Sequence, residues 1–205
     1  MIAVIMCGGQ GTRMIGNSEK PLVRIGGSPL LLRVVQALRD SHRFESIIAA
    51  VSTQAPATSE FAKSLGLQVI ETPGQGYSRD LSDLLNRLRP SRVLVISADM
   101  PLVTGQIIDE VVSKEQTKPL LSIILTREFV EEIGITSSVT FKKDGVDYCH
   151  SGISIFDASR HSDGTLEEEY AVMNRTEIAV NVNTRKELEL AEKLLVQRAQ
   201  NIAQD

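Results

Sequence analysis

The chain opens with Ile2-Ala3-Val4-Ile5-Met6-Cys7-Gly8-Gly9-Gln10-Gly11-Thr12-Arg13-Met14, an apolar run that leads directly into a glycine-dense loop. The run Ile2–Met6 predicts a central strand that is apolar on both faces. Glycines directly behind a buried strand let backbone N–H groups approach a ligand, because they carry no side chain. Arg13 and Lys20 add two cations to the same region. Backbone donors together with cations indicate a site for a polyphosphate.

The bulk composition narrows the class of protein. The 205 residues are 42% hydrophobic and 23% charged, which is ordinary for a globular chain with one sizeable core. The net charge of -4 argues against a general nucleic-acid-binding protein, whose surface is usually basic. The only two cysteines, Cys7 and Cys149, match no metal-binding spacing, so we expect free thiols in a reducing compartment.

Signals for export or membrane insertion are not found in the sequence. No apolar run approaches the roughly 20 residues that a transmembrane helix needs. No basic segment precedes the N-terminal apolar residues, as it would in a signal peptide. We therefore expect a cytoplasmic protein without stable membrane insertion.

Strand and helix patterns alternate through the first half of the chain. Buried apolar runs predict strands, and apolar residues at helical spacing predict the helices between them. This alternation favours a parallel sheet that helices cover on both faces. The predicted strands are Ile2–Met6, Ile47–Val51, Gln68–Ile70 and Arg92–Ser97, and the predicted helices are one starting at Ser28-Pro29, Pro56–Leu65 and Tyr77–Leu88.

The second half is less regular. Strands are predicted over Leu120–Leu125 and Gly152–Phe156, and Lys143-Asp144-Gly145 predicts the turn of a hairpin. The other elements are the hairpin strands Val139–Phe141 and Val146–Cys149, an acidic surface excursion over Asp163–Tyr170, a last strand over Ile178–Val182, and a capping box of Thr184 and Glu187 before a C-terminal helix. Without a linker or a repeat, residues 1–205 are expected to form a single domain. Residues 1–103 would bind a nucleotide, and residues 104–205 would form the acceptor side and the C-terminal helix.

Two familiar phosphate-binding motifs do not fit the opening loop. The dinucleotide-binding fingerprint needs a third glycine where the chain has Met14. The P-loop ends in Gly-Lys-Ser/Thr, whereas this loop ends in Gly11-Thr12-Arg13. The order Gly-Gly-x-Gly-Thr-Arg-Met, followed by Glu19-Lys20-Pro21-Leu22, instead resembles the nucleotidyltransferases of the sugar-nucleotide and molybdenum-cofactor type.

Within that group, the chain is similar to the archaeal GTP:adenosylcobinamide-phosphate guanylyltransferases of the MobA-like NTP transferase superfamily. The resemblance rests on the opening loop through Leu22, Gly74-Gln75-Gly76-Tyr77 with Asp80-Leu81, Val95-Ile96-Ser97-Ala98-Asp99, Asn181-Val182-Asn183-Thr184 with Leu188 and Ala191-Glu192, and Ser151-Gly152-Ile153. Two departures are Cys7, where many relatives have alanine, and one extra residue between Arg13 and Lys20. The resemblance implies a three-layer α/β/α Rossmann-like fold with a mostly parallel sheet. It also implies transfer of GMP from GTP to a corrinoid phosphate.

The resemblance assigns a role to each site residue. The backbone of Gly8, Gly9, Gln10, Gly11 and Thr12, together with Arg13, would hold the β and γ phosphates, and Lys20 would stabilise charge at the α phosphate. Asp99 would bind Mg²⁺, with Asn183, or less favourably Asn181, as a second oxygen ligand. Gly74, Gly76 and Asp80 would recognise guanine, and Ser151 and Gly152 would line the acceptor side. Catalysis of this kind is mostly positioning and charge neutralisation, so no general base is required.

Other readings stay open from the residues alone. Asp99 could cap a turn, Asp80 could stabilise a helix N-terminus, and Asn183 could cap the last helix. His150, beside Ser151, could contact the acceptor or lie plainly on the surface. The acceptor could be a molybdenum cofactor or a sugar phosphate, and a regulator that binds GTP without catalysis is the alternative of another class. We expect no nucleic-acid partner, and a homodimer is one option.

Overall fold

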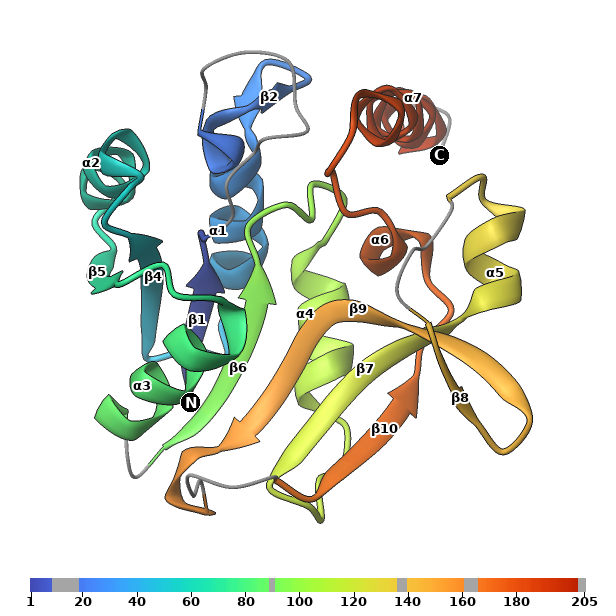
Figure 1. Cartoon of the computed structure of the whole chain (residues 1–205). Helices are drawn as coiled ribbons and strands as arrows, with labels where there is room; N and C mark the ends of the chain where they lie inside the picture. The colour runs from blue at the N-terminus through green and yellow to red at the C-terminus, as the bar shows by residue number, and fades with distance from the viewer. Residues whose placement is uncertain (9–18, 89–90, 136–139, 161–165, 203–205) are drawn as a thin grey trace.

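The computed structural model describes residues 1–8, 19–88, 91–135, 140–160 and 166–202. Within these residues, eight strands form one mixed sheet (Figure 1). Only β9 runs antiparallel among the seven strands of the main order, and β8 (Phe141–Lys143) pairs with β9 outside it. The order across the sheet is β10 (Glu168–Val172), β7 (Leu120–Thr126), β9 (Val146–Asp157), β6 (Arg92–Ser97), β1 (Ile2–Met6), β4 (Ser46–Ser52) and β5 (Gln68–Thr72).

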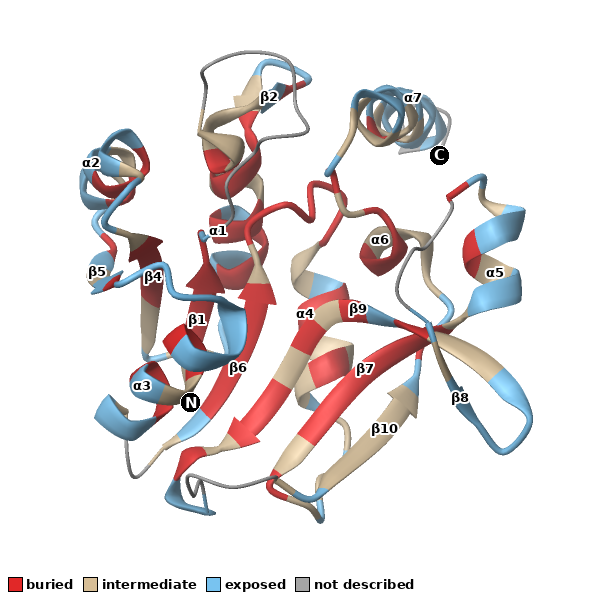
Figure 2. Ribbon diagram, in the orientation of Figure 1, coloured by how far each residue is buried: buried red, intermediate tan, exposed pale blue. Residues whose placement is uncertain are grey.

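Alternate side chains of the central strands enter two separate cores, one on each face of the sheet. Ala3 and Ile5 of β1 join a core with α1 (Leu30–Asp40) and α4 (Gly105–Val112). Val4 and Met6 join a second core with α3 (Tyr77–Arg87). Figure 2 shows that the central strands are largely buried. Helices therefore cover both faces, and the expected three-layer fold is confirmed.

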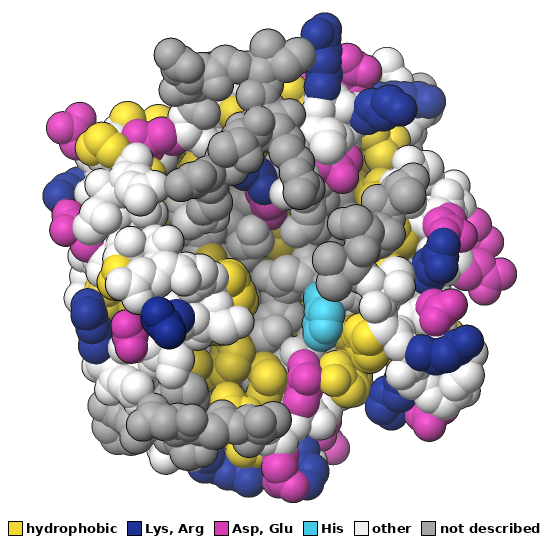
Figure 3. Space-filling model, in the orientation of Figure 1, with side chains coloured by type: hydrophobic (Ala, Val, Ile, Leu, Met, Phe, Trp, Pro, Cys, Tyr) yellow, Lys and Arg dark blue, Asp and Glu magenta, His cyan; other side chains and the backbone are white. Residues whose placement is uncertain are grey.

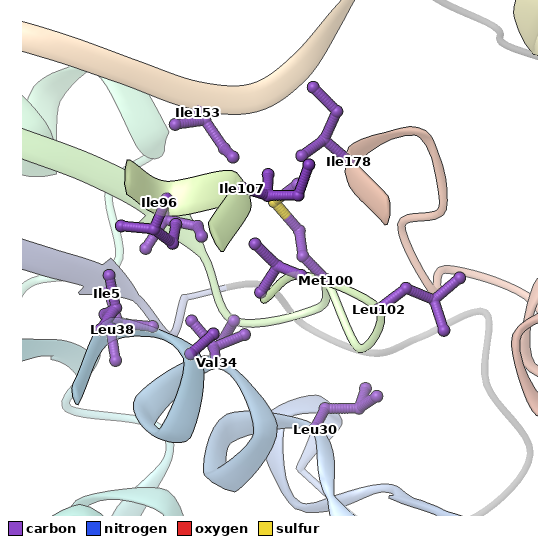
Figure 4. Close-up of a cluster of buried hydrophobic side chains, with 14 of the residues drawn as sticks. Ile5, Leu30, Val34, Leu38, Ile96, Met100, Leu102, Ile107, Ile153 and Ile178 are labelled. Atoms are coloured by element: carbon purple, nitrogen blue, oxygen red, sulfur yellow. The ribbon is translucent and has the colours of Figure 1, made fainter. Parts of the chain in front are cut away.

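The first of these cores extends from the N-terminal half into the second half. Figure 4 shows Ile5 beside Leu38, and it shows Ile107 of α4 near Ile153 of β9 and Ile178. All of these side chains are almost fully buried. Burying one such side chain stabilises the fold by about 1.5–3 kcal/mol. Packing of this kind fixes the strands of the two halves against each other.

The predicted elements of the first half are confirmed, except at the start of α1. Strands β1, β4, β5 and β6 lie where apolar runs occur, and α2 (Pro56–Ser64) and α3 follow the predicted spacing. Ser28 and Pro29 do not open the helix as predicted. They form β3 (Ser28–Pro29), which pairs with β2 (Arg24–Ile25) around a glycine turn, and Pro29 is itself the N-cap residue. Proline suits both positions, because its fixed φ is compatible with extended backbone and with a helix start.

In the second half, the structure joins two predicted strands into one and adds a strand that the sequence did not predict. The predicted strands Val146–Cys149 and Gly152–Phe156 are parts of one twelve-residue strand, β9. The segment predicted as a surface excursion contains the edge strand β10, which pairs in parallel with β7. Its acidic composition fits an edge strand, because charged side chains are tolerated where one side of a strand faces solvent. Residues 139 and 163–165 of these predictions lie outside the described residues.

The prediction of a last strand over Ile178–Val182 is wrong. Thr176–Ala179 forms a short helix, α6, and residues 180–182 follow as irregular backbone. A short buried apolar run cannot be told from a helical turn by its periodicity, which explains the error. The capping box is confirmed, because Thr184 N–H donates to Glu187 and Glu187 N–H donates to Thr184 Oγ1 at the start of α7 (Arg185–Ile202).

Besides α6, two helices of the second half were not predicted, α4 and α5 (Arg127–Glu132). Each begins with a threonine whose hydroxyl accepts a backbone N–H, Thr104 and Thr126 respectively. Two 3₁₀ turns complete the described chain, η1 (Lys20–Leu22) and η2 (Ala158–Arg160). Among the described residues, none of the helices is both long enough and apolar enough to span a membrane.

Candidate active site

The carboxyl ends of β1 and β6 lie side by side in the sheet. The chain after β1 leads to β4 on one side, whereas the chain after β6 leads to β7 on the other side. β1 pairs with β4 on one side and with β6 on the other, all in parallel. Loops that leave such a point bound a crevice, and open α/β sheets bind ligands there. Cys7 N–H donates to the Ala50 carbonyl at 2.8 Å, and Ala98 N–H donates to the Met6 carbonyl at 3.1 Å. The first bond holds the start of the loop after β1 against β4, and the second holds the start of the loop after β6 against β1.

Of the predicted phosphate loop, Gly8 lies within the described residues. Gly8 is exposed, and a Cβ atom there would have no heavy atom within 4 Å, so its backbone is open to a ligand. Cys7, by contrast, is buried, and its thiol lies 3.6 Å from the carbonyl oxygen of Ile5. Burial raises the pKa of this thiol, which keeps it protonated. Gly9, Gln10, Gly11, Thr12 and Arg13 lie outside the described residues.

A polar cluster, consisting of Lys20, Asp99, Asn181 and Asn183, lies in the crevice. The Lys20 ammonium donates to Asp99 Oδ2 and to Asn183 Oδ1, the latter at 2.6 Å. The side chains of Lys20 and Asp99 are only 15% and 10% exposed. Figure 3 shows a basic and an acidic side chain in contact within the hollow on this face of the molecule. The structure thus brings together three of the predicted site residues from distant parts of the chain.

Hydrogen bonds from the segment 181–183 hold both the side chain and the backbone of Asp99 in place. Asn181 Nδ2 donates to Asp99 Oδ1 at 3.2 Å, and Val182 N–H donates to the Asp99 carbonyl at 2.9 Å. Asn183 N–H donates to a carboxylate oxygen of Glu187 at 2.6 Å, so the helix cap holds Asn183 as well. Asn181 therefore orients the Asp99 carboxylate, while Asn183 directs its side-chain oxygen to the Lys20 ammonium group. This division of roles agrees with the preference for Asn183 over Asn181 as a metal ligand.

The polar cluster has donor chemistry that fits a divalent cation. Asp99 Oδ2 and Asn183 Oδ1 both contact one cation, the Lys20 ammonium, so two oxygens converge on one point. Mg²⁺ prefers oxygen ligands and keeps several waters. No group of three or more His, Cys, Asp or Glu side chains suited to a metal occurs among the described residues. A metal held here would therefore take its other ligands from water and from a bound phosphate.

Glu19 anchors the backbone next to Lys20, a role that no sequence motif predicted. Its two carboxylate oxygens accept the backbone N–H groups of Ala57 at 2.9 Å and Thr58 at 2.6 Å. Both donors lie in the first turn of α2, whose N-cap residue, Ala55, supplies no side-chain cap. A carboxylate at a helix N-terminus is favourable for the helix. An alanine at the N-cap position of α2 is the signal that could have suggested a capping residue from a distant part of the chain.

The predicted base-binding loop is shaped by two glycines and Asp80. Gly74 has φ +71°, and a Cβ atom there would lie 2.8 Å from Ser52 Oγ, while Gly76 has φ +116°. Both conformations favour glycine. Asp80 is buried, and its Oδ1 accepts the Gln75 N–H at 3.3 Å. The carboxylate thus helps to hold the loop, which favours its reading as a helix-terminal residue, and direct contact with a base stays a prediction.

Ser151 and Gly152 lie at a bulge of β9, directly beside the polar cluster. Gly152 has φ +91°, and a Cβ atom there would lie 3.0 Å from Asn181 Nδ2. Ser151 is buried, its hydroxyl donates to the Ile123 carbonyl at 2.8 Å, and it accepts the Ile153 N–H at 3.1 Å. This placement favours a structural role for Ser151, because its hydroxyl has partners inside the fold. Gly152 is needed to leave room for Asn181.

Comparisons with known proteins agree with this geometry. Residues 3–130 match the family of MobA-like NTP transferase domains. Adenosylcobinamide-phosphate guanylyltransferase of Methanocaldococcus jannaschii is 30% identical over 95% of this chain and 97% of its own. A probable molybdenum cofactor guanylyltransferase of Thermococcus kodakarensis is 27% identical over 92% of each chain. A hypothetical transferase structure from Thermus thermophilus, 18% identical, shares the fold with a TM-score of 0.68 over 91% of this chain and 98% of that chain. The chain belongs to the MobA-like NTP transferase family and is a nucleotidyltransferase.

Proposed function

We propose that the protein transfers GMP from GTP to adenosylcobinamide phosphate, giving adenosylcobinamide-GDP and pyrophosphate. The observation that carries this proposal is the polar cluster, in which Lys20, Asp99 and Asn183 meet at the crevice. A cation can stabilise charge on a reacting phosphate, and carboxylate and amide oxygens can hold the Mg²⁺ that phosphoryl transfer uses.

In the proposed reaction, an oxygen of the acceptor phosphate attacks the α-phosphorus of GTP. The bond from that phosphorus to the oxygen bridging to the β phosphate breaks, and pyrophosphate leaves with the electron pair. The attacking phosphate is already ionised, so no side chain has to remove a proton. Lys20 would neutralise charge on the α phosphate, which would compete with Asp99 for the Lys20 ammonium group.

Asp99 and Asn183 are the residues that would hold Mg²⁺. Such an ion neutralises phosphate charge and helps align the attacking and leaving oxygens. Asn181 would keep the Asp99 carboxylate in place through its hydrogen bond. The backbone from Gly8 to Thr12, with Arg13, would bind the β and γ phosphates.

The base and the acceptor would lie on opposite sides of this cluster. We propose that Gly74 and Gly76 offer backbone groups to guanine, while Asp80 maintains the loop. The acceptor phosphate would enter beside Gly152. A corrinoid acceptor is supported by the relative from Methanocaldococcus jannaschii, whose match spans nearly both chains. A molybdenum cofactor is the second candidate, because the relative from Thermococcus kodakarensis also matches along nearly the whole chain.

The test is to incubate the purified protein with Mg²⁺ and GTP, to add one acceptor at a time, and to follow pyrophosphate. Adenosylcobinamide phosphate should give stoichiometric release, and ATP in place of GTP should give much less. Release only with the molybdenum cofactor or a sugar phosphate would transfer the assignment to that acceptor. Tight GTP binding without release in any mixture would favour a non-catalytic regulator.

Substitution of the cluster gives the largest expected loss of activity. Lys20→Ala and Asp99→Ala should each lower kcat by roughly 100-fold or more, because each removes a charge aimed at the phosphates or the metal. Lys118→Ala is the matched control, since Lys118 pairs with Glu167 at 3.1 Å on the surface. Circular dichroism should show that all three variants are folded. Near-normal turnover of either cluster variant would contradict its assigned role.

A further inference from the structure

The aromatic side chains of this chain are few, and several of them gather at one place outside the two cores. The sequence has five phenylalanines, three tyrosines and no tryptophan. Phe141, Tyr148 and Tyr170 belong to neither core, and His150 joins them. The ring centroid of Phe141 lies 4.9 Å from that of His150, 5.2 Å from that of Tyr170 and 5.9 Å from that of Tyr148. We call these four residues the aromatic patch.

The aromatic patch lies on a part of the sheet that no described helix covers. Its members come from β8, β9 and β10, which carry their other side chains, such as Cys149 and Ala171, into or against the α1–α4 core. Figure 1 shows β9, β7 and β10 open to the viewer, with α3 over the other part of this face. Figure 3 shows a histidine at the middle of the same view with hydrophobic side chains beside it. His150 is exposed, and the three rings around it are partly exposed.

Hydrogen bonds hold part of the aromatic patch in a fixed position. The Tyr170 hydroxyl donates to Glu168 Oε2 at 2.8 Å, and the Ser122 hydroxyl donates to the other oxygen of the same carboxylate. Ser122 Oγ is also 3.3 Å from Ser154 Oγ on β9. Phe141 and Tyr148 are a directly opposed cross-strand pair of β8 and β9. A surface that is ordered before binding loses little conformational entropy when a ligand contacts it.

Strand β9 connects the aromatic patch to the reacting centre. His150 precedes Gly152 by two residues, so their Cα atoms lie at most roughly 7 Å apart. Gly152 is itself packed against Asn181, which orients Asp99. A ligand whose phosphate lies beside Gly152 can therefore reach the aromatic patch with the rest of its structure.

We propose that the aromatic patch binds the non-reacting, ring-bearing body of the acceptor, with its phosphate directed to the polar cluster. The inference rests on the proposed function and specifies where that acceptor makes its contacts. Exposed ring faces suit a large, partly apolar ring system such as a corrin. A sugar would instead need several hydrogen-bond donors and acceptors, whereas the polar groups Ser122, Glu168 and the Tyr170 hydroxyl already bond one another. Lys143, 6.0 Å from the Tyr170 ring centroid, adds a cation at the edge of the patch.

The experiment measures GTP and acceptor kinetics of Phe141→Ala and His150→Ala with adenosylcobinamide phosphate as the acceptor. Each variant should raise KM for the corrinoid roughly 5- to 10-fold through lost ring contacts. KM for GTP and kcat should stay within about twofold, because neither residue contacts the polar cluster. Equilibrium dialysis of the coloured corrinoid, without turnover, should show the same loss of affinity. Val196→Ala, which changes an exposed apolar residue of α7, is the control.

The outcomes separate this inference from the proposed function. If the wild-type protein uses the corrinoid but both variants keep its KM within twofold, the aromatic patch does not bind the acceptor and the proposed function stands. An equal rise in KM for GTP would also overturn the inference, because it would indicate a general disturbance. Since Phe141→Ala alters a hairpin contact, His150→Ala, which changes an exposed ring, remains decisive if the former unfolds. If the wild-type protein does not use the corrinoid at all, both the proposed function and this inference fail.

Discussion

On the proposed nucleotide side of the crevice, Lys20, Asp99 and Asn183 come from distant parts of the chain and are joined by hydrogen bonds. On the other side, the aromatic patch is assembled from adjacent or nearby strands, and its members contact one another mainly through ring faces. The polar cluster depends on several separate elements holding their places. The aromatic patch depends mainly on local strand pairing.

This difference leads to different expectations for the two sides. Interactions between charges in a partly buried site change steeply with distance, and a displacement of about 1 Å can lower turnover roughly 100-fold. Contacts between rings and an apolar ligand are less directional. We therefore expect disturbances of the polar cluster to lower kcat, and disturbances of the aromatic patch to raise the acceptor KM.

Gly152 lies on β9 between the aromatic patch and the polar cluster. Its substitution gives the sharpest test of whether disturbing the polar cluster lowers kcat. Gly152→Ala should lower kcat roughly 10-fold, because its Cβ atom would lie 3.0 Å from Asn181 Nδ2 and displace a partner of Asp99. It should also destabilise the protein by about 1–3 kcal/mol, since φ there is +91°. Steady-state kinetics and thermal unfolding measure the two effects.

Gly145→Ala is the matched control for backbone strain. Gly145 lies in the turn between β8 and β9 with φ +84°, and a Cβ atom there would meet no heavy atom within 4 Å. This variant should lose similar stability but keep kcat within about twofold. Equal kcat values for the two variants would show that the packing of Gly152 against Asn181 does not matter for turnover.

Glu19 tests whether the polar cluster depends on remote anchoring. Glu19→Ala removes two hydrogen bonds to the first turn of α2, at 2.9 and 2.6 Å, and should destabilise the protein by about 1–2 kcal/mol. Because Lys20 is the next residue, kcat should also fall, by roughly 3- to 10-fold, while Glu19→Asp should restore part of the loss. Glu45→Ala is the control, since Glu45 is largely exposed and pairs with the N-terminus at 3.4 Å on the surface. A lower Tm with unchanged kcat would limit Glu19 to a stabilising role.

The sequence predicted most of the polar cluster, because charged residues beside strand ends can be located by motif. Lys20 follows the glycine-dense loop, and Asp99 ends the apolar run of β6. The sequence did not predict the hydrogen bond from Asn181 that orients the Asp99 carboxylate. That bond depends on irregular backbone, which was predicted as a strand because Ile178 and its neighbours form a short apolar run.

The aromatic patch was not predicted as a unit, for a different reason. Phe141 and Tyr170 are far apart in the sequence, and they meet only because β10 pairs with β7, which pairs with β9. Neither strand order nor register follows from periodicity alone. The segment that contains β10 is acidic and polar, so nothing local marked it as part of a sheet.

Cys7 gives the smallest expected effect and concerns stability only. Burial raises the pKa of its thiol in the folded protein, whereas in the unfolded chain a thiol loses its proton near pH 8.5. Above that pH the folded state binds more protons than the unfolded state, so the free energy of unfolding falls as pH rises. At pH 10 the Cys7 thiol should account for a loss of about 1–2 kcal/mol relative to neutral pH.

Cys7→Ala should remove this part of the pH dependence, which urea unfolding at pH 7 and pH 10 would measure. Cys149→Ala, also at a buried thiol, corrects at pH 7 for the packing lost on removing a sulfur atom. If Cys7→Ala keeps the full wild-type loss between the two pH values, another group causes it. Turnover of Cys7→Ala near neutral pH should stay within about twofold of wild type, because the thiol faces the strand carbonyl of Ile5 and is almost fully buried. We therefore expect the polar cluster to set turnover and the neighbouring Cys7 thiol to set only stability, and this pair of measurements separates the two effects.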